Sequence, residues 1–252
     1  SSNNLWIGIY QKGVAFIPSQ ANMFNYIGNF SSIRNYIGSN CITALCETTD
    51  KGKLIVGTDN DGIYLLDKNY NFIQHLTQDK NPDVPPTVMC LFEDSNKKVW
   101  IGSYLSGISV FDSQTNKLSK TSLRNNEGNE ITKVYRFVED PHKRLWIGTM
   151  GTGLYYVDLP ASSASYSDLK VHQALSEKEI NQWINTLLYI PNGRLYIGTY
   201  DGIKCIDTEK LKVVGKEKVL IGLSINTIAQ GPDDHIWAGT PEGIYVMEDR
   251  KS

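Results

Sequence analysis

Six residues of this 252-residue chain have side chains suited to binding a polyhydroxylated ligand, and they fall in equivalent segments of a pattern that recurs along the chain. Each lies in a short variable segment between two apolar runs: Tyr10, Asp59, Asp61, Tyr104, Tyr200 and Glu242. Aromatic rings stack on the apolar faces of sugars, and carboxylates accept hydrogen bonds from hydroxyl groups. These residues are therefore our predicted ligand contacts. The residues of any exposed turn between packed strands are also free to vary, so it stays open that these segments vary without binding a ligand.

Candidates for catalysis are weaker. The carboxylate pairs Glu93-Asp94 and Glu139-Asp140 recur at one position ahead of a turn, which favours a structural role. The four histidines do not share metal-ligand spacing, and the sequence contains no nucleophile elbow, phosphate-binding loop or calcium loop. We therefore expect no catalytic residue, no metal ligands and no cofactor.

One phrase recurs six times and must position the predicted contacts: an apolar run that ends at glycine, followed shortly by a second glycine. Its clearest copy is Leu145-Trp146-Ile147-Gly148-Thr149, followed by Gly153-Leu154-Tyr155-Tyr156-Val157-Asp158. The first glycines lie 41 to 50 residues apart: Gly8, Gly57, Gly102, Gly148, Gly198 and Gly239. A period of about 20–50 residues indicates a repeat array or a propeller.

Each copy predicts two antiparallel strands joined by a tight turn, because aromatic and β-branched residues favour strands and glycine permits positive φ. A further apolar stretch precedes each copy, as in Val88 to Phe92, and a weaker one follows, as in Phe72 to Leu76. Four strands in about 40–50 residues form one propeller blade. We predict an all-β fold, a single β-propeller domain over residues 1–252, with five to six four-stranded blades at approximately 1–30, 40–76, 86–122, 130–173, 183–215 and 224–250.

The same count predicts an incomplete ring. By the order of the expected strands, the first blade lacks its first strand and the last blade lacks its fourth. A ring of seven such repeats needs roughly 320 residues, of which this chain would be a fragment. Unpaired sheet edges favour association, which predicts a homo-oligomer.

Four of the five tryptophans occupy the same place in the phrase: Trp6, Trp100, Trp146 and Trp237. An aromatic residue at a fixed repeat position is expected to pack between neighbouring blades. Trp183 lies outside this pattern, so it is the tryptophan whose environment is of most interest.

Composition excludes several classes of partner. The formal net charge is −2 and the sequence pI is about 6.1, so we expect no nucleic acid and no anionic membrane surface as a partner. No apolar run approaches the roughly 18 residues of a membrane span, so we expect no membrane contact by this segment.

The repeat resembles the two-component regulator propeller. The shared pattern is Asp-x-x-Gly/Lys-x-Leu-Trp-Ile-Gly-Thr-x-x-x-Gly-Ile/Leu-x-x-Ile/Val-Asp, with an Asn-x-Ile opening of the first strand at Asn40-Cys41-Ile42 and Asn226-Thr227-Ile228. The resemblance covers essentially the whole chain. Departures are Ile55 in place of tryptophan, Ala238 in place of isoleucine and Pro18 in place of the acidic residue.

This resemblance implies the periplasmic sensor region of a hybrid two-component histidine kinase, of the type found in gut Bacteroidetes. Such regions respond to oligosaccharides from complex glycans, so an oligosaccharide is the implied ligand. The implied partners are a second propeller and the downstream domains of the same parent chain. Two alternatives stay open: a structural or protein-interaction propeller, and a polysaccharide lyase or glycosidase.

Overall fold

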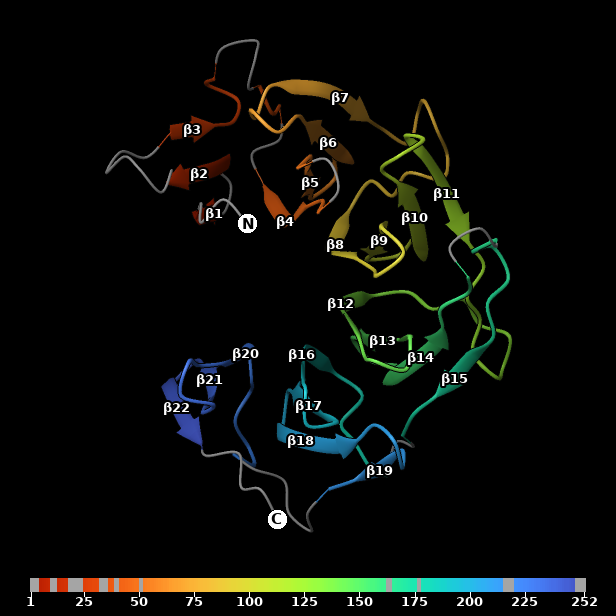
Figure 1. The fold of residues 1–252 in the computed structure, drawn as a ribbon, viewed down its shortest axis with the longest axis vertical. Helices are drawn as coiled ribbons and strands as arrows, with labels where there is room; N and C mark the ends of the chain where they lie inside the picture. The colour runs from red at the N-terminus through yellow and green to blue at the C-terminus, as the bar shows by residue number, and fades with distance from the viewer. Residues whose placement is uncertain are drawn as a thin grey trace. The chain divides into compact units, whose positions relative to one another are not determined.

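The computed structural model describes residues 5–9, 13–17, 25–31, 36–38, 41–49, 52–161, 165–175, 178–214 and 220–247. Every regular element in these ranges is a β-strand, which confirms the all-β prediction. No helix of the described residues is long and apolar enough to cross a membrane. The chain divides into two compact units, Ser1–Thr121 and Ser122–Ser252, and each contains three antiparallel sheets (Figure 1).

The first unit contains one three-stranded sheet and two four-stranded sheets. The first sheet consists of β1 (Leu5–Ile9), β2 (Gly13–Ile17) and β3 (Asn25–Ile27). The second consists of β4 (Ile42–Glu47), β5 (Leu54–Thr58), β6 (Ile63–Leu66) and β7 (Phe72–Leu76). The third consists of β8 (Val88–Glu93), β9 (Lys98–Ser103), β10 (Ile108–Asp112) and β11 (Lys117–Thr121).

The second unit contains two four-stranded sheets and one three-stranded sheet. The fourth sheet of the chain consists of β12 (Val134–Glu139), β13 (Arg144–Thr149), β14 (Leu154–Asp158) and β15 (Val171–Gln173). The fifth consists of β16 (Ile184–Ile190), β17 (Arg194–Thr199), β18 (Gly202–Asp207) and β19 (Lys212–Val213). The sixth consists of β20 (Thr227–Gln230), β21 (Ile236–Thr240) and β22 (Gly243–Met247).

Each sheet is a meander in which chain neighbours pair, as expected for propeller blades. The two halves of the phrase form the second and third strands, so that Trp146 of β13 lies opposite Tyr156 of β14. In the sixth sheet the first strand begins at Thr227, and Ile225 precedes it. The N–H of Ile225 donates to the carbonyl of Thr199 in the preceding sheet, at 2.9 Å. Six sheets agree with the expected five to six blades, whereas the seven-bladed parent ring and the self-association stay predictions.

The two glycines of the phrase have different roles. The second glycine has positive φ in all six copies, for example 70° at Gly62 and 96° at Gly153, as predicted for a turn. The first glycine does not have positive φ. A Cβ atom on Gly148 would lie 2.8 Å from the Ile184 side chain of the next sheet. Glycine is therefore needed at Gly57, Gly148 and Gly198, where a Cβ atom would collide with a residue of the next sheet or of the segment that leads into it.

The residue after the first glycine closes the turn between the second and third strands. Its hydroxyl donates to the carbonyl of the second glycine, at 2.7 Å from both Ser103 and Thr149. Thr58, Thr199 and Thr240 make the same bond. This bond gives the loop after the second strand a common base in five of the six copies, whereas the first copy has Ile9 at this position.

The cores lie between neighbouring sheets of each unit. In the second unit, one core combines Trp146 and Leu154 of the fourth sheet with Ile184, Leu195 and Ile197 of the fifth. Trp100 and Trp146 are fully buried, which confirms the expected packing role for these two. The expectation is wrong for Trp237, which is 40% exposed, because β21 presents this side chain to solvent in the sixth sheet.

Candidate functional site

The two ends of each sheet differ in how the chain uses them. We call the loops after the second strands, with the segments that lead into the first strands, the loop side. Its described residues are 58–62, 86–87 and 103–107 in the first unit, and 149–153, 181–183, 199–202, 223–226 and 240–243 in the second. We call the opposite ends the turn side, which comprises residues 67–71, 94–98 and 112–117 in the first unit, and 140–144, 190–194 and 207–212 in the second.

Backbone hydrogen bonds hold the loop side in place. Within a sheet, the N–H of Tyr200 donates to the carbonyl of Trp183, at 3.1 Å. Between sheets of one unit, the N–H of Gly153 donates to the Gln182 carbonyl at 3.2 Å, and that of Gly202 to the Leu223 carbonyl at 2.8 Å. The loops are therefore anchored to two sheets, and side chains that they carry are positioned before any ligand arrives.

In the first unit, the structure brings Asp59 and Tyr104 to one residue, Thr87. The Thr87 hydroxyl donates to the Asp59 carboxylate at 3.3 Å, and the Thr87 carbonyl accepts the N–H of Tyr104 at 3.3 Å. Asp59 is exposed and the Tyr104 side chain is 40% exposed. These two predicted contacts therefore share one accessible surface.

Asp61 is engaged by its own sheet. Its carboxylate accepts the Tyr64 hydroxyl at 2.7 Å, and its carbonyl lies 2.7 Å from Nε2 of His75. Burial and then the bond to Asp61 raise the pKa of Tyr64, so the phenol stays protonated and continues to donate. Asp61 therefore contributes to the loop structure, and its carboxylate is less available to a ligand than that of Asp59.

In the second unit, Tyr200 lies next to Trp183. Their ring centroids are 6.3 Å apart with an interplanar angle of 63°, an edge-to-face arrangement. Trp183 is 48% exposed and Tyr200 is 63% exposed. With Asn181 they line a shallow hollow of about 350 Å³. We call these three residues the aromatic platform.

Backbone hydrogen bonds fix the aromatic platform, but two of its polar side-chain groups form no hydrogen bond within the protein. The Asn181 side-chain oxygen accepts the N–H of Trp183 at 2.9 Å, and the backbone of Trp183 bridges to Met150. Within the part of the chain that the structure describes, the indole N–H of Trp183 and the hydroxyl of Tyr200 have no hydrogen-bond partner. Two aromatic faces with unpaired polar groups suit a ligand that offers both apolar faces and hydroxyl groups.

The other predicted contacts are less informative. Glu242 is exposed in the last loop, where its N–H donates to the Thr240 hydroxyl at 3.1 Å. Tyr10 lies outside the described residues. The site list from sequence omitted Trp183 and Asn181. The sequence did set Trp183 apart, because it is the tryptophan outside the repeat pattern, and in the structure its ring is exposed.

On the turn side, the buried carboxylates form hydrogen bonds with neighbouring groups of the protein. Asp140 accepts the N–H groups of His142 and Arg144, and its second oxygen accepts the indole N–H of Trp146 at 2.9 Å. Asp94 serves Trp100 in the same way, also at 2.9 Å. The structural interpretation of the paired carboxylates is therefore confirmed for both aspartates.

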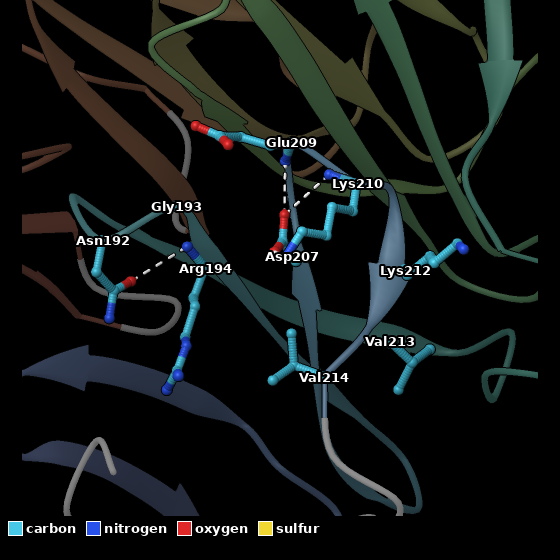
Figure 2. A pocket seen from close by; sticks show the side chains of 9 residues that line it. All are labelled: Asn192, Gly193, Arg194, Asp207, Glu209, Lys210, Lys212, Val213 and Val214. Atoms are coloured by element: carbon cyan, nitrogen blue, oxygen red, sulfur yellow. Dashed lines mark hydrogen bonds and ion pairs between the residues drawn. The ribbon is translucent and has the colours of Figure 1, made fainter. Parts of the chain in front are cut away.

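A hollow of about 500 Å³ also lies on the turn side of the fifth sheet (Figure 2). Its carboxylate Asp207 accepts the N–H groups of Glu209 and Lys210, at 3.0 and 2.9 Å, and so caps its own turn. The side chains of Arg194 and Lys212 extend in different directions in Figure 2. The charged groups therefore do not converge on one ligand position.

The described residues contain no group of three or more histidine, cysteine, aspartate or glutamate side chains placed to hold a metal ion. The exposed side chains of Tyr104, Trp183 and Tyr200 on the loop side can stack on a ligand and form hydrogen bonds with it.

Residues 84–105 match the family model described as "Two component regulator propeller". They run from Val84 through β8 and β9 to the loop that carries Tyr104. No curated protein matches the sequence significantly.

Solved structures with this fold span all or nearly all of the chain. An extracellular domain assigned to the one component system BT4673 of B. thetaiotaomicron has a TM-score of 0.76 at 20% identity, over 100% of this chain and 31% of that one. One assigned to the hybrid two component system BT3049 of B. thetaiotaomicron has a TM-score of 0.67 at 20% identity, over 100% and 39%. PorZ of Porphyromonas gingivalis, described as a surface component of the type-IX secretion system, has a TM-score of 0.71 at 15% identity, over 99% and 39%.

This chain thus spans between about a third and two fifths of the length of these three proteins. At such identities the likeness concerns the fold, which is that of a β-propeller. The described residues form an all-β propeller segment of six small antiparallel sheets, and residues 84–105 match the two-component regulator propeller model.

Proposed function

We propose that this chain is a ligand-sensing propeller of an extracytoplasmic two-component sensor and that it binds glycan-derived oligosaccharides without transforming them. The observation that carries the proposal is the exposed aromatic platform on the loop side of a chain with the regulator propeller repeat. The extracellular domains of similar fold support an extracytoplasmic, periplasmic location.

The mechanism that we propose is a shift of population. A ligand on the loop side contacts loops whose backbones are bonded to two neighbouring sheets of a unit, such as the loop of Gly153 and Gln182. Binding therefore favours one arrangement of these sheets over others. The shift in the equilibrium between the two arrangements is set by the difference in the ligand's affinity for them. The kinase that receives the signal belongs to the parent chain.

The proposal is tested by titrating oligosaccharides released from complex glycans into the intact sensor region, with calorimetry and thermal melting as readouts. We expect heat of binding and a raised melting temperature, because a ligand that binds only the folded state stabilises it. Absence of both effects with every saccharide contradicts the proposal.

A double variant, Tyr104→Ala with Tyr200→Ala, tests the site within the intact sensor. Both side chains are exposed, so we expect sugar-dependent signalling to be lost while the melting temperature stays nearly unchanged. Tyr245→Ala is the matched control, because Tyr245 is 37% exposed on β22 and is not among the predicted contacts. Normal signalling by the double variant would place the site elsewhere in the parent.

A second function, protein interaction, is favoured by the sixth sheet. Its edge strand β22 exposes Ile244 at 71% and Val246 at 48%, and an apolar strand edge can pair with another chain. Recovery of a stable protein partner, together with no saccharide binding, would favour this scaffold function. Turnover of a polysaccharide by the chain would instead favour the lyase or glycosidase alternative.

A further inference from the structure

A second hollow, of about 220 Å³, lies on the loop side of the fourth sheet. Its wall is the connection between β11 and β12, in which the Asn125 side chain accepts the N–H groups of Glu127 and Asn129, at 3.1 and 2.9 Å. Its floor includes Tyr155, which is 3% exposed and donates its hydroxyl to the Thr152 carbonyl at 2.8 Å. We call this hollow the amide pocket.

Two amide side chains of this pocket have unused hydrogen-bonding groups. Asn126 and Gln173 both line it and both are exposed. Among the residues that the structure describes, neither side-chain amide has a hydrogen-bond partner. Each amide can donate and accept at once, which matches the hydroxyl groups of a sugar.

Gly151 connects the amide pocket to the aromatic platform. It lines the pocket, and a Cβ atom placed on it would lie 3.9 Å from the indole nitrogen of Trp183. Its N–H donates to the Gln182 carbonyl at 2.9 Å, so the loop is fixed against the segment that carries the platform. The lack of a side chain at Gly151 leaves the path between the two hollows open.

The size of each hollow indicates how they would be used. Sites for whole small-molecule ligands usually enclose about 300–1,000 Å³. The amide pocket falls below this range and the platform lies at its lower end. Each hollow is therefore suited to one sugar unit, and a longer ligand needs both.

The charges around the two hollows select against acidic ligands. The charged residues that line the amide pocket are Glu127 and Glu130, both acidic, and the platform residues carry no charge. The nearby Arg124 guanidinium donates to the Gly128 carbonyl at 2.9 Å, and its single positive charge is outnumbered by the two carboxylates. Uronate or sulfate groups would be repelled by these carboxylates, whereas neutral hydroxyl groups can donate to them.

We propose that the aromatic platform and the amide pocket are two subsites of one extended site for an uncharged oligosaccharide of at least two sugar units. The inference rests on the proposed carbohydrate-sensing function and adds the ligand class. Trp183 and Tyr200 stack on one unit, while Asn126 and Gln173 bond the hydroxyl groups of the next.

The test uses the full chain and a panel of saccharides: neutral hexose mono-, di- and tetrasaccharides, and uronate-containing and sulfated disaccharides. Calorimetry and tryptophan fluorescence report binding. We expect neutral disaccharides to bind at least about tenfold more tightly than monosaccharides, because they occupy both subsites, and acidic disaccharides to bind at least about tenfold more weakly than neutral ones.

Variants separate the two subsites. Trp183→Ala should weaken neutral disaccharide binding by about tenfold or more, since a tryptophan in an interface often contributes a large share of the binding free energy. Asn126→Ala with Gln173→Ala should lower disaccharide affinity towards the monosaccharide value and leave monosaccharide binding unchanged. Trp237→Ala is the matched control, because this indole is 40% exposed in the sixth sheet, and it should change nothing.

The outcomes distinguish this inference from the function on which it rests. Binding of neutral saccharides that is unaffected by Trp183→Ala, or binding of acidic saccharides only, overturns the two-subsite site and leaves carbohydrate sensing intact. Failure of every saccharide to bind overturns the proposed function as well.

Discussion

Trp146 and Trp183 lie in the same unit and are used in opposite ways. Trp146 is fully buried, its indole N–H donates to Asp140, and the Arg144 guanidinium lies 5.5 Å from its ring centroid. Trp183 is 48% exposed, and among the described residues its indole N–H has no hydrogen-bond partner. The contrast teaches that the packing of the surrounding sheets, and not residue type, decides whether a tryptophan stabilises the fold or remains available to a ligand.

The contrast extends to the two sides of the sheets. On the turn side, Arg144 donates to Asp140 at 2.8 Å and to the Thr208 carbonyl of the next sheet at 2.6 Å, so that one side chain joins two sheets. On the loop side, backbone groups join neighbouring sheets, and among the described residues the Trp183 indole N–H and the Tyr200 hydroxyl have no hydrogen-bond partner. Substitution of these two side chains therefore costs little stability.

The largest expected effect is that of Trp146→Ala. Removal of this fully buried side chain leaves a cavity and takes away one of the hydrogen bonds that Asp140 accepts, so we expect a loss of about 3–5 kcal/mol in the free energy of unfolding. Chemical denaturation of the full chain measures it. A loss as small as that of a surface substitution would mean that Trp146 does not stabilise the fold, and the contrast with Trp183 would fail.

A smaller loss is expected from Gly198→Ala. The new methyl group would lie 2.5 Å from the Thr186 side chain and 2.8 Å from that of Ile225, both β-branched and stiff, so overpacking should cost about 1–3 kcal/mol. Gly8→Ala is the matched control at the same repeat position, because no described atom lies within 4 Å of its Cβ. Equal stability of the two variants contradicts the packing role of the first glycine.

The turn side should also lose stability in acid through Asp112. Burial raises the pKa of this carboxyl, but the Lys98 ammonium at 2.7 Å and the N–H groups of Gln114 and Thr115 outweigh burial and lower the pKa from 3.8 to about 2. The resulting stability is present above about pH 4 and is lost as the pH falls through about 2. Because the carboxylate is 23% exposed, Asp112→Asn should cost only about 1 kcal/mol at pH 7.

Unfolding of this variant at pH 7 and at pH 2 supplies the comparison, because its deficit should nearly vanish at the lower pH. A double-mutant cycle with Lys98→Met isolates the contribution of the ion pair. A deficit that does not change with pH would assign the loss to something other than the ionised carboxylate.

The smallest effect is expected from Trp183→Ala on stability. The ring is half exposed and its indole N–H is not needed by the fold, so the free energy of unfolding should change by less than about 0.5 kcal/mol. Denaturation in parallel with Trp146→Ala gives the direct contrast. A loss of several kcal/mol here would mean that Trp183 serves the fold, and the comparison between the two tryptophans would fail.

The amino-acid sequence alone determined the class of fold and the position of most strands, because these depend on local patterns. The apolar runs and paired glycines predicted the second and third strands, and they form with Trp146 opposite Tyr156. Turn chemistry was also local: Asp67 and Asp207 accept N–H groups two to four residues further on, because an aspartate side chain can bond the backbone that follows it.

Only the tertiary structure decided which residues of these patterns are available for function. Asp59 and Asp61 look equivalent in sequence, yet Asp61 is bonded by Tyr64 and Asp59 stays exposed. The platform joins Trp183 to Tyr200 because β16 begins where the loop after β17 returns, an adjacency across the sheet that no local pattern specifies. Local propensity determines elements, whereas exposure and neighbours depend on how distant elements pack.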